Sequence, residues 1–269
     1  MRDALRAATT QLAGVSETPR LDAELLMAHA LATTRDALIL RHLDDPAPSA
    51  FADLVTRRLA HEPVAYITGI RDFWTISLHV APGVLIPRPD SETLIEAAVD
   101  YFAGTPGPRS VLDLGTGSGA LLLAALAEWP LATGIGIDAS DAAIAIARDN
   151  AKRLGMTDRA QILRGDWTGH GGPHDLILCN PPYIGTDEAL PRDVMDWEPS
   201  SALFAGADGL DDYRRIAAVL RPQLAPGGVL CIEIGATQAD SVGELFAARG
   251  FGVALARDLA GRARCLIVT

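Results

Sequence analysis

An asparagine, two prolines and a tyrosine stand together where a buried strand should end. They are Asn180, Pro181, Pro182 and Tyr183, and they follow the short apolar run DLILC at residues 175–179. Prolines stop a strand and provide no backbone N–H donors, so carbonyl oxygens, an amide and a phenol remain at the rim of the sheet. These groups can bind a small, flat, polar group.

A glycine-rich loop lies upstream, in VLDLGTGSGA at residues 111–120. Glycines let the backbone turn tightly and approach a ligand at the carboxyl edge of parallel strands. Asp138 ends the next expected strand, about 20 residues further on, where a carboxylate can hold both hydroxyls of a ribose. The pattern predicts a nucleoside cofactor. The loop residues that we expect to bind it are Gly115, Thr116, Gly117, Ser118 and Gly119.

Two cofactors fit this loop. Residues 115–120 also satisfy the dinucleotide fingerprint G-x-G-x-x-G/A, so a dehydrogenase stays an alternative. Asp113, two residues before the first glycine, suits the ammonium of a methionine moiety better than a pyrophosphate, which favours S-adenosyl-L-methionine. In the stretch GDW, Asp166 could accept a hydrogen bond from the adenine amine while Trp167 packs against its ring.

With a methyl donor bound, the rim after residue 179 predicts methylation of a planar nitrogen. An amide or exocyclic amine delocalises its lone pair and is a weak nucleophile. The Asn180 side-chain oxygen and the Pro181 carbonyl can accept its two N–H groups, while Tyr183 stacks on the flat group. Positioning then carries most of the rate gain, and no strong base is needed. Adenine, cytosine, guanine and glutamine all present such a nitrogen, so these residues leave the substrate open.

The composition narrows the partners. The net charge is −11 and Lys152 is the single lysine, which disfavours a phosphate backbone as the main partner. We expect a protein substrate, no direct nucleic-acid contact, no membrane and a monomer. The N-terminus lacks a basic-then-apolar signal and no run approaches about 20 apolar residues, so we expect a cytoplasmic protein. Cysteine and histidine spacings indicate neither a disulfide framework nor a metal site.

The spacing of apolar residues changes at two places along the chain. Residues 1–69 have leucines at helical spacing and predict a small helical bundle. Residues 70–89 alternate around Phe73, Ile76 and Leu78 and predict a β-hairpin linker, with the turn at APG, residues 81–83. Residues 90–269 alternate strands and helices, which predicts an α/β domain with a mostly parallel, Rossmann-like sheet covered on both faces.

The order and spacing of these motifs resemble Class I methyltransferases, and the whole chain resembles the HemK/PrmC family of protein-(glutamine-N5) methyltransferases. The most family-specific stretches are LIPRPDSE, NPPYI and EPSSALFAGADGLDDYRRI, although serine replaces the common threonine in the first. The resemblance implies methyl transfer to the glutamine of the Gly-Gly-Gln loop of class 1 peptide chain release factors. The residues that match the family's cofactor positions are Gly115, Gly117, Gly119, Asp138, Trp167 and Asn180.

The resemblance also implies that residues 180–183 form the substrate clamp and that the helical bundle helps to hold the release factor. We expect residues 184–196 to be a loop that closes over the substrate. Arg88 could reach the cofactor tail or the substrate backbone, or only support a helix start, and Glu198 is expected to anchor a helix or loop. A nucleic-acid exocyclic-amine methyltransferase and a cofactor-binding module without turnover remain alternatives.

Overall fold

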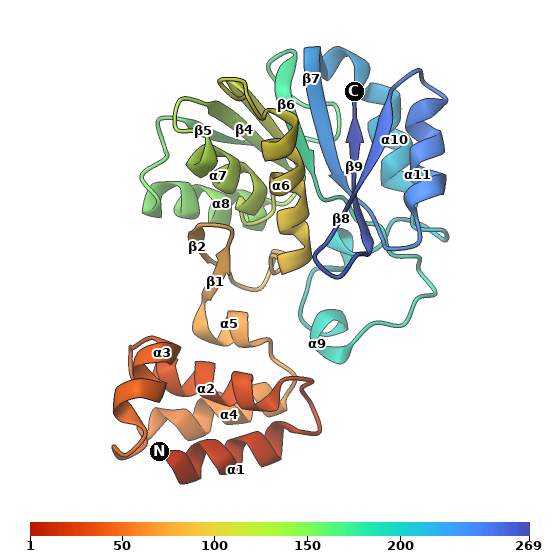
Figure 1. The fold of residues 1–269 in the computed structure, drawn as a ribbon. Coiled ribbons are helices and arrows are strands. Elements are labelled where there is room, and N and C mark those ends of the chain that lie inside the picture. The colour runs from red at the N-terminus through yellow and green to blue at the C-terminus, as the bar shows by residue number, and fades with distance from the viewer. The chain divides into compact units, whose positions relative to one another are not determined.

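The computed structural model describes all residues from Met1 to Thr269, and the chain divides into two compact units (Figure 1). The smaller unit comprises Met1–Ile70 together with Leu190–Trp197. The larger unit comprises Arg71–Ala189 and Glu198–Thr269. A segment from the second half of the chain therefore belongs to the N-terminal helical unit.

The smaller unit is helical. Its helices bury apolar side chains at helical spacing, including Leu12, Leu26, Met27 and Phe51. Pro19 starts the second helix at its first position, where a missing backbone N–H costs nothing. The elements are α1 (Arg2–Leu12), α2 (Pro19–Ala30), α3 (Arg35–Ala37), the π-helix η1 (Leu38–His42), α4 (Ala50–Leu59), α5 (Val64–Thr68) and α9 (Arg192–Met195).

Helix α9 corrects the expectation of a simple loop over residues 184–196. The buried guanidinium of Arg58 on α4 pairs with Asp22 at 2.8 Å and with Asp193 of α9 at 3.7 Å. Because Asp193 shares this buried cation, residues 190–197 fold with the helical unit. Whether the neighbouring residues close over a substrate stays a prediction.

The larger unit is built on a seven-stranded sheet with the order β5-β4-β3-β6-β7-β9-β8. The five strands from β5 to β7 are parallel, and β9 and β8 complete the sheet antiparallel. The strands are β3 (Ser110–Leu114), β4 (Thr133–Asp138), β5 (Ala160–Arg164), β6 (His174–Cys179), β7 (Leu224–Glu233), β8 (Val253–Arg257) and β9 (Ala263–Val268).

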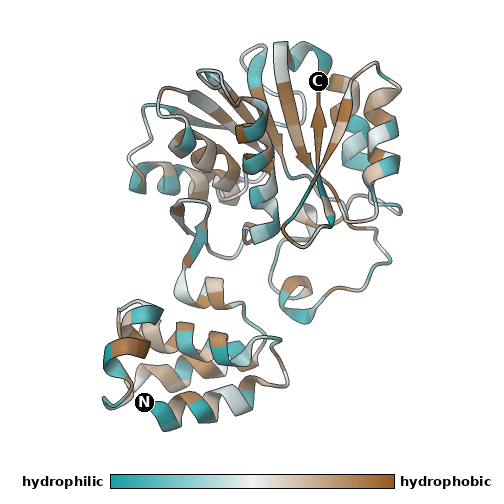
Figure 2. Cartoon of the chain, viewed as in Figure 1, coloured by the Kyte–Doolittle hydropathy of each residue, from teal (hydrophilic) through white to brown (hydrophobic).

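Helices cover both faces of the sheet, as expected. Successive strand residues point to opposite faces, so Leu176 and Leu178 pack in one core and Ile177 and Cys179 in the other. The first core faces α6 (Glu92–Tyr101), α7 (Ala120–Glu128) and α8 (Asp141–Arg153), and the second faces α10 (Asp211–Val219) and α11 (Ala239–Ala247). Burial on both faces explains the continuous apolar runs that Figure 2 shows along the strands.

Short 3-10 turns complete the larger unit, and they are η2 (Pro89–Ser91), η3 (Ser200–Ala202) and η4 (Arg221–Gln223). None of the helices in either unit combines the length and apolar character that a bilayer span requires.

The hairpin differs from its prediction. Its strands are β1 (Ile70–Phe73) and β2 (Ile76–His79), and the turn falls at Trp74, which has φ 54°, rather than at residues 81–83. Those three residues form a separate turn after β2, closed by a hydrogen bond from Val84 N to Ala81 O. From Arg71 onward the hairpin belongs to the larger unit, because Phe73, Ile76 and Leu78 are buried in its core.

Candidate active site

The glycine loop and the Asn-Pro-Pro-Tyr stretch meet at the centre of the sheet. Strands β3 and β6 are neighbours with Leu114 opposite Cys179, so Gly115 and Asn180 leave the sheet side by side. The chain runs from β3 to β4 and β5 in one direction and from β6 to β7 in the other. Such a switch in strand order leaves a crevice at the carboxyl edge, where open α/β sheets bind ligands.

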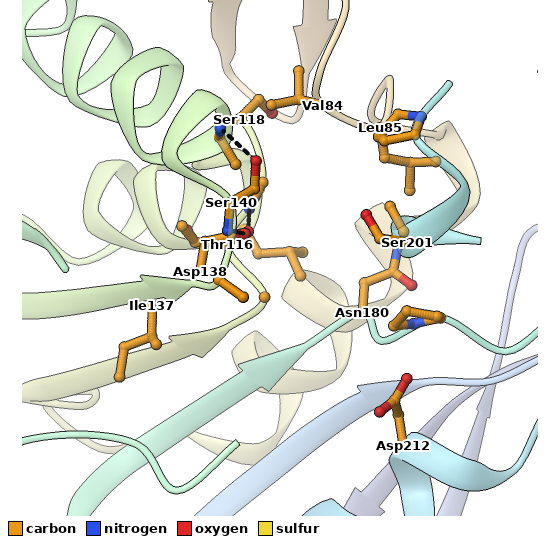
Figure 3. A pocket seen from close by; sticks show the side chains of 18 of the residues that line it. Val84, Leu85, Thr116, Ser118, Ile137, Asp138, Ser140, Asn180, Ser201 and Asp212 are labelled. Atoms are coloured by element: carbon orange, nitrogen blue, oxygen red, sulfur yellow. Dashed lines mark hydrogen bonds between the residues drawn. The ribbon is translucent and has the colours of Figure 1, made fainter. Parts of the chain in front are cut away.

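A cavity of about 780 Å³ occupies this crevice within the larger unit. In Figure 3, Thr116, Ser118, Asp138 and Ser140 lie on one side, with Asn180, Ser201 and Leu85 on the other. The predicted site residues that line the cavity are Gly115, Thr116, Gly117, Ser118, Asp138, Asp166, Trp167, Asn180 and Pro182. The predicted residues that do not line it are Asp113, Gly119, Pro181 and Tyr183.

Asp138 and the glycine loop are held together by backbone hydrogen bonds. Gly117 N donates to one carboxylate oxygen of Asp138 at 2.9 Å, and Ser140 N donates to the other at 2.8 Å. Gly117 has φ 55°, and nothing lies within 4 Å of the place where a Cβ would stand, so the loop is open to a ligand there. Each carboxylate oxygen keeps a further lone pair, so Asp138 can still accept the two hydroxyls of a ribose.

Trp167 closes the cavity beside this loop. A Cβ on Gly115 would stand 3.3 Å from the Trp167 ring, and the indole Nε1 donates to Asp212 at 2.9 Å. Asp166 is exposed and accepts from both the backbone N–H and the hydroxyl of Thr168, which lower the pKa of its carboxyl. Its contact with an adenine amine stays a prediction.

Asp113 lies beneath the loop and is buried. Its Oδ2 accepts from the hydroxyl of Thr116 at 2.6 Å and from Leu122 N at 3.2 Å, while Oδ1 has no hydrogen-bond partner. Burial raises the pKa of Asp113 to about 7. A buried acceptor without a partner costs free energy until a donor reaches it, and the contact of Asp113 with an ammonium stays a prediction.

The first and last residues of the Asn-Pro-Pro-Tyr stretch lie in different surroundings. Asn180 lines the cavity and its Nδ2 donates to the Ser91 hydroxyl at 3.3 Å, which leaves Oδ1 available as an acceptor. Tyr183 instead lies mainly against the second core, with its hydroxyl donating to Glu233 at 3.3 Å. Burial and the Glu233 charge raise the pKa of this phenol, so it stays protonated. Stacking of Tyr183 on a substrate remains a prediction.

Arg88 has a partner within the larger unit. Its guanidinium pairs with the buried carboxylate of Glu198 at 2.5 Å, and Ile86 N donates to the other carboxylate oxygen at 3.1 Å. Glu198 therefore anchors residues 86–88 of the LIPRPDSE stretch, as its expected anchoring role suggests. Since Arg88 neutralises this acid, the geometry favours the supporting role for Arg88 over a contact with the cofactor tail.

Three polar groups of the site were not predicted from the sequence. Asp212 and Ser91 line the cavity, and Glu233 lies directly behind the clamp. Asp212 and Ser91 lie inside the stretches EPSSALFAGADGLDDYRRI and LIPRPDSE, and Glu233 ends the apolar strand β7. The doubled acid in GLDDY could have indicated Asp212, and the single acid at the end of an apolar strand could have indicated Glu233. An ionisable residue in an apolar setting needs a partner.

Comparisons with known proteins agree with this geometry. Residues 3–69 match the model of the PrmC N-terminal domain, and residues 93–195 match the Methyltransferase small domain. A solved methyltransferase from Pyrococcus furiosus shares the fold with a TM-score of 0.56 and 16% identity, covering 81% of this chain and 98% of that chain. The larger unit is thus a Rossmann-like methyltransferase domain.

Curated relatives identify the family. A release factor glutamine methyltransferase from Rhodospirillum rubrum is 44% identical over 96% of this chain and 80% of the relative. Another from Cereibacter sphaeroides is 45% identical over 97% and 95% of the two chains. The chain belongs to the release factor glutamine methyltransferase family, which confirms the resemblance to HemK/PrmC and sets the dehydrogenase aside.

Proposed function

We propose that this protein transfers a methyl group from S-adenosyl-L-methionine to the side-chain amide nitrogen of the glutamine in the Gly-Gly-Gln motif of class 1 peptide chain release factors. The observation that carries the proposal is that the glycine loop and the Asn-Pro-Pro-Tyr stretch meet at one cavity. The glycine loop with Asp138 lines one side of the cavity, and Asn180 lines the other.

The substrate clamp would work through acceptors. Asn180 Oδ1 and the Pro181 carbonyl, neither of which accepts a hydrogen bond from the chain, can take the two N–H groups of a carboxamide. This holds the amide plane and directs one face of its nitrogen into the cavity. It also stabilises the positive charge that develops on nitrogen during transfer. The proton that nitrogen gives up can leave to water, so the clamp requires no base.

The cavity fits an adenosyl cofactor with an amino-acid tail. Asp138 would hold the ribose hydroxyls, Trp167 would pack against the adenine, and the partnerless Oδ1 of Asp113 would accept from the ammonium. Gly115 to Gly119 would let the backbone approach the tail. When bound, S-adenosylmethionine supplies an electrophilic methyl group on a sulfonium.

The helical unit, residues 1–69, is proposed to dock the release factor, and residues 90–269 to carry out catalysis. Its match to the PrmC N-terminal domain supports the docking role. A protein substrate agrees with the net charge of −11, which disfavours direct nucleic-acid contact. We propose that the protein acts as a monomer, in the cytoplasm where translation termination takes place.

The proposal is tested with radiolabelled S-adenosylmethionine, a class 1 release factor, and the same factor with the Gly-Gly-Gln glutamine replaced by alanine. We expect label on the first factor and none on the second, with a gain of one methyl mass on the glutamine. Asn180→Ala should reduce transfer by about three orders of magnitude, since a main orienting acceptor is lost. Label that survives the glutamine substitution, or that appears on naked DNA or RNA, contradicts the proposal.

A further inference from the structure

A buried carboxylate stands behind the substrate clamp. Glu233 is 2% exposed at the end of β7, where β6 and β7 run side by side with Cys179 opposite Ile232. It thus sits next to the point at which Asn180 leaves the sheet. Its Oε1 accepts from the Tyr183 hydroxyl at 3.3 Å, while Oε2 is buried without a hydrogen-bond partner.

Ser91 connects this carboxylate to the amide that faces the cavity. The Ser91 oxygen accepts from Asn180 Nδ2 at 3.3 Å. Ser91 also lies near Glu233, where its hydroxyl favours the ionised carboxylate and so lowers its pKa. Glu233 therefore contacts Tyr183 directly, and Ser91 lies near Glu233 and is hydrogen-bonded to Asn180, with the partnerless Oε2 available to accept the Ser91 hydrogen.

The number of hydrogens that Ser91 can donate determines the direction of its hydrogen bonds. An ionised carboxylate only accepts, and a serine hydroxyl has one hydrogen to donate. When the Ser91 hydrogen points to Glu233, Ser91 can offer only a lone pair to Asn180. The Asn180 amide must then turn its NH2 to Ser91 and its oxygen to the cavity.

We propose that Glu233 is a positioning residue that, through Ser91 and Tyr183, fixes the Asn180 carboxamide with its oxygen toward the substrate. This inference deepens the proposed function and rests on it for the identity of the substrate amide. An Asn180 amide flipped by 180° would present N–H groups to the N–H groups of the substrate, which repel. The clamp would then hold no carboxamide in the reactive orientation.

The ionised state of Glu233 is poised near neutrality. Burial raises its pKa to about 7, against the lowering effects of Ser91, Arg264 and Tyr183. Arg264 is the cation that faces it, and that guanidinium is shared with Asp90 at 3.0 Å. The charged and titratable groups that act on Glu233 from the surrounding elements are Arg264 and Cys265 on β9, Asp90 in η2, Cys179 on β6, Tyr183 after β6 and Tyr213 on α10. The cysteine and tyrosine pKa values are raised by burial, so these groups stay neutral through this range.

Protonation of Glu233 removes the directional constraint. A protonated carboxyl can donate to Ser91, whose hydroxyl is then free to donate to the Asn180 oxygen. We therefore expect clamp function to be present above about pH 7 and to fall as the pH decreases through it, and Glu233→Gln to remove this dependence.

The first test reads the amide without any methyl acceptor. Side-chain ¹⁵N signals of Asn180, assigned by their loss in Asn180→Ser, are followed from pH 5.5 to 8.5 in the full-length protein. We expect a shift with a midpoint near pH 7 that is absent from Glu233→Gln and Ser91→Ala. The matched control is Asp175→Asn, which removes a carboxylate that accepts the Ser110 hydroxyl at the amino-terminal ends of β3 and β6, away from the cavity. It should titrate as the wild type does.

The second test uses methyl transfer to the release factor. Glu233→Gln should reduce kcat by about 100-fold, the size expected for a misplaced orienting group, while the dissociation constant of S-adenosylmethionine stays unchanged. The double variant Ser91→Ala Glu233→Gln should be no slower than the slower single variant, because both act through one path. A pH-independent Asn180 signal in the wild type, or wild-type turnover of Glu233→Gln at pH 6 and pH 8, would overturn the inference. If the wild type methylates no release factor while the Asn180 titration is present, the proposed function fails and the positioning inference stands.

Discussion

The indole Nε1 of Trp167 donates to the buried carboxylate of Asp212 at 2.9 Å, and this bond joins the loop after β5 to helix α10. Asp212 also pairs with Arg215 at 3.2 Å, so the acid is neutralised while it holds the indole. The wall of the cavity beside Gly115 is thus fixed by a residue about 45 positions away in sequence. A cofactor ring that packs on Trp167 meets a side chain whose orientation is already set.

Asp212→Ala is therefore expected to weaken cofactor binding without touching the ribose site. A hydrogen bond to a charged group contributes about 1.5–3 kcal/mol, so the dissociation constant of S-adenosylmethionine should rise by at least tenfold. Titration calorimetry and Trp167 fluorescence measure the effect. The control is Asp211→Ala, which removes the exposed neighbouring acid paired with Arg214. Equal affinities in the two variants would show that the Asp212 bond does not orient Trp167 for binding.

The two carboxylates of the proposed cofactor site, Asp138 and Asp113, should differ in the ligands that they help to bind. Asp138→Ala is expected to weaken both S-adenosylmethionine and 5′-methylthioadenosine, because both carry the ribose. Asp113→Asn should weaken S-adenosylmethionine by about tenfold or more and leave methylthioadenosine unchanged, because that ligand lacks the amino-acid tail. Calorimetry with each ligand checks both statements. Parallel losses for the two ligands in Asp113→Asn would mean that Asp113 only supports the loop through Thr116.

Much of this architecture could be read from local sequence. The G-x-G-x-G loop, Asp138 and the Asn-Pro-Pro-Tyr stretch each follow an apolar strand, and parallel strands bring their carboxyl ends to one edge. That rule predicts that Gly115, Asp138, Trp167 and Asn180 converge, and all four line the cavity.

The parts that the sequence did not reveal depend on long-range pairing. Trp74 takes the left-handed turn conformation that glycine favours, so the hairpin turn has neither the proline nor the glycine that mark a turn at residues 81–83. Asp193 pairs with the buried Arg58 of α4, a long-range contact that no local sequence pattern reveals. Glu233 looks like an isolated acid in an apolar strand until the register places it beside the clamp.

Stability should depend on pH through two buried acids. Burial raises the pKa of both Asp113 and Glu233 to about 7, above their ordinary values. Below about pH 4 both carboxyls are protonated in the folded and in the unfolded protein. Between pH 4 and 7 they lose the proton in the unfolded chain but keep it in the folded protein. The free energy of unfolding of the cofactor-free protein should therefore fall with rising pH, by up to about 1.4 kcal/mol per pH unit for each group, and level off above pH 7.

The double variant Asp113→Asn Glu233→Gln isolates this contribution. Its stability relative to wild type should increase from pH 5 to pH 7 and stay constant from pH 7 to pH 8, as measured by urea midpoints at each pH. Asp175→Asn, whose parent carboxyl has a lowered pKa, serves as the control and should show no such increase. A constant difference between double variant and wild type across this range would contradict the raised pKa values.

The helical unit offers a test of docking that leaves the methyltransferase domain intact. Leu21 and Leu25 lie one turn apart on α2 and are 40% and 36% exposed, so they form an apolar ridge suited to a protein partner. Leu21→Ser Leu25→Ser should raise the KM for a full-length release factor by about tenfold, as expected for anchoring side chains, and leave kcat unchanged. A short Gly-Gly-Gln peptide, which reaches only the clamp, should be methylated at the wild-type rate. Leu131→Ser Leu259→Ser changes two exposed leucines of the larger unit and should alter neither substrate. If both double variants raise the KM for the release factor equally, the docking surface does not lie on α2.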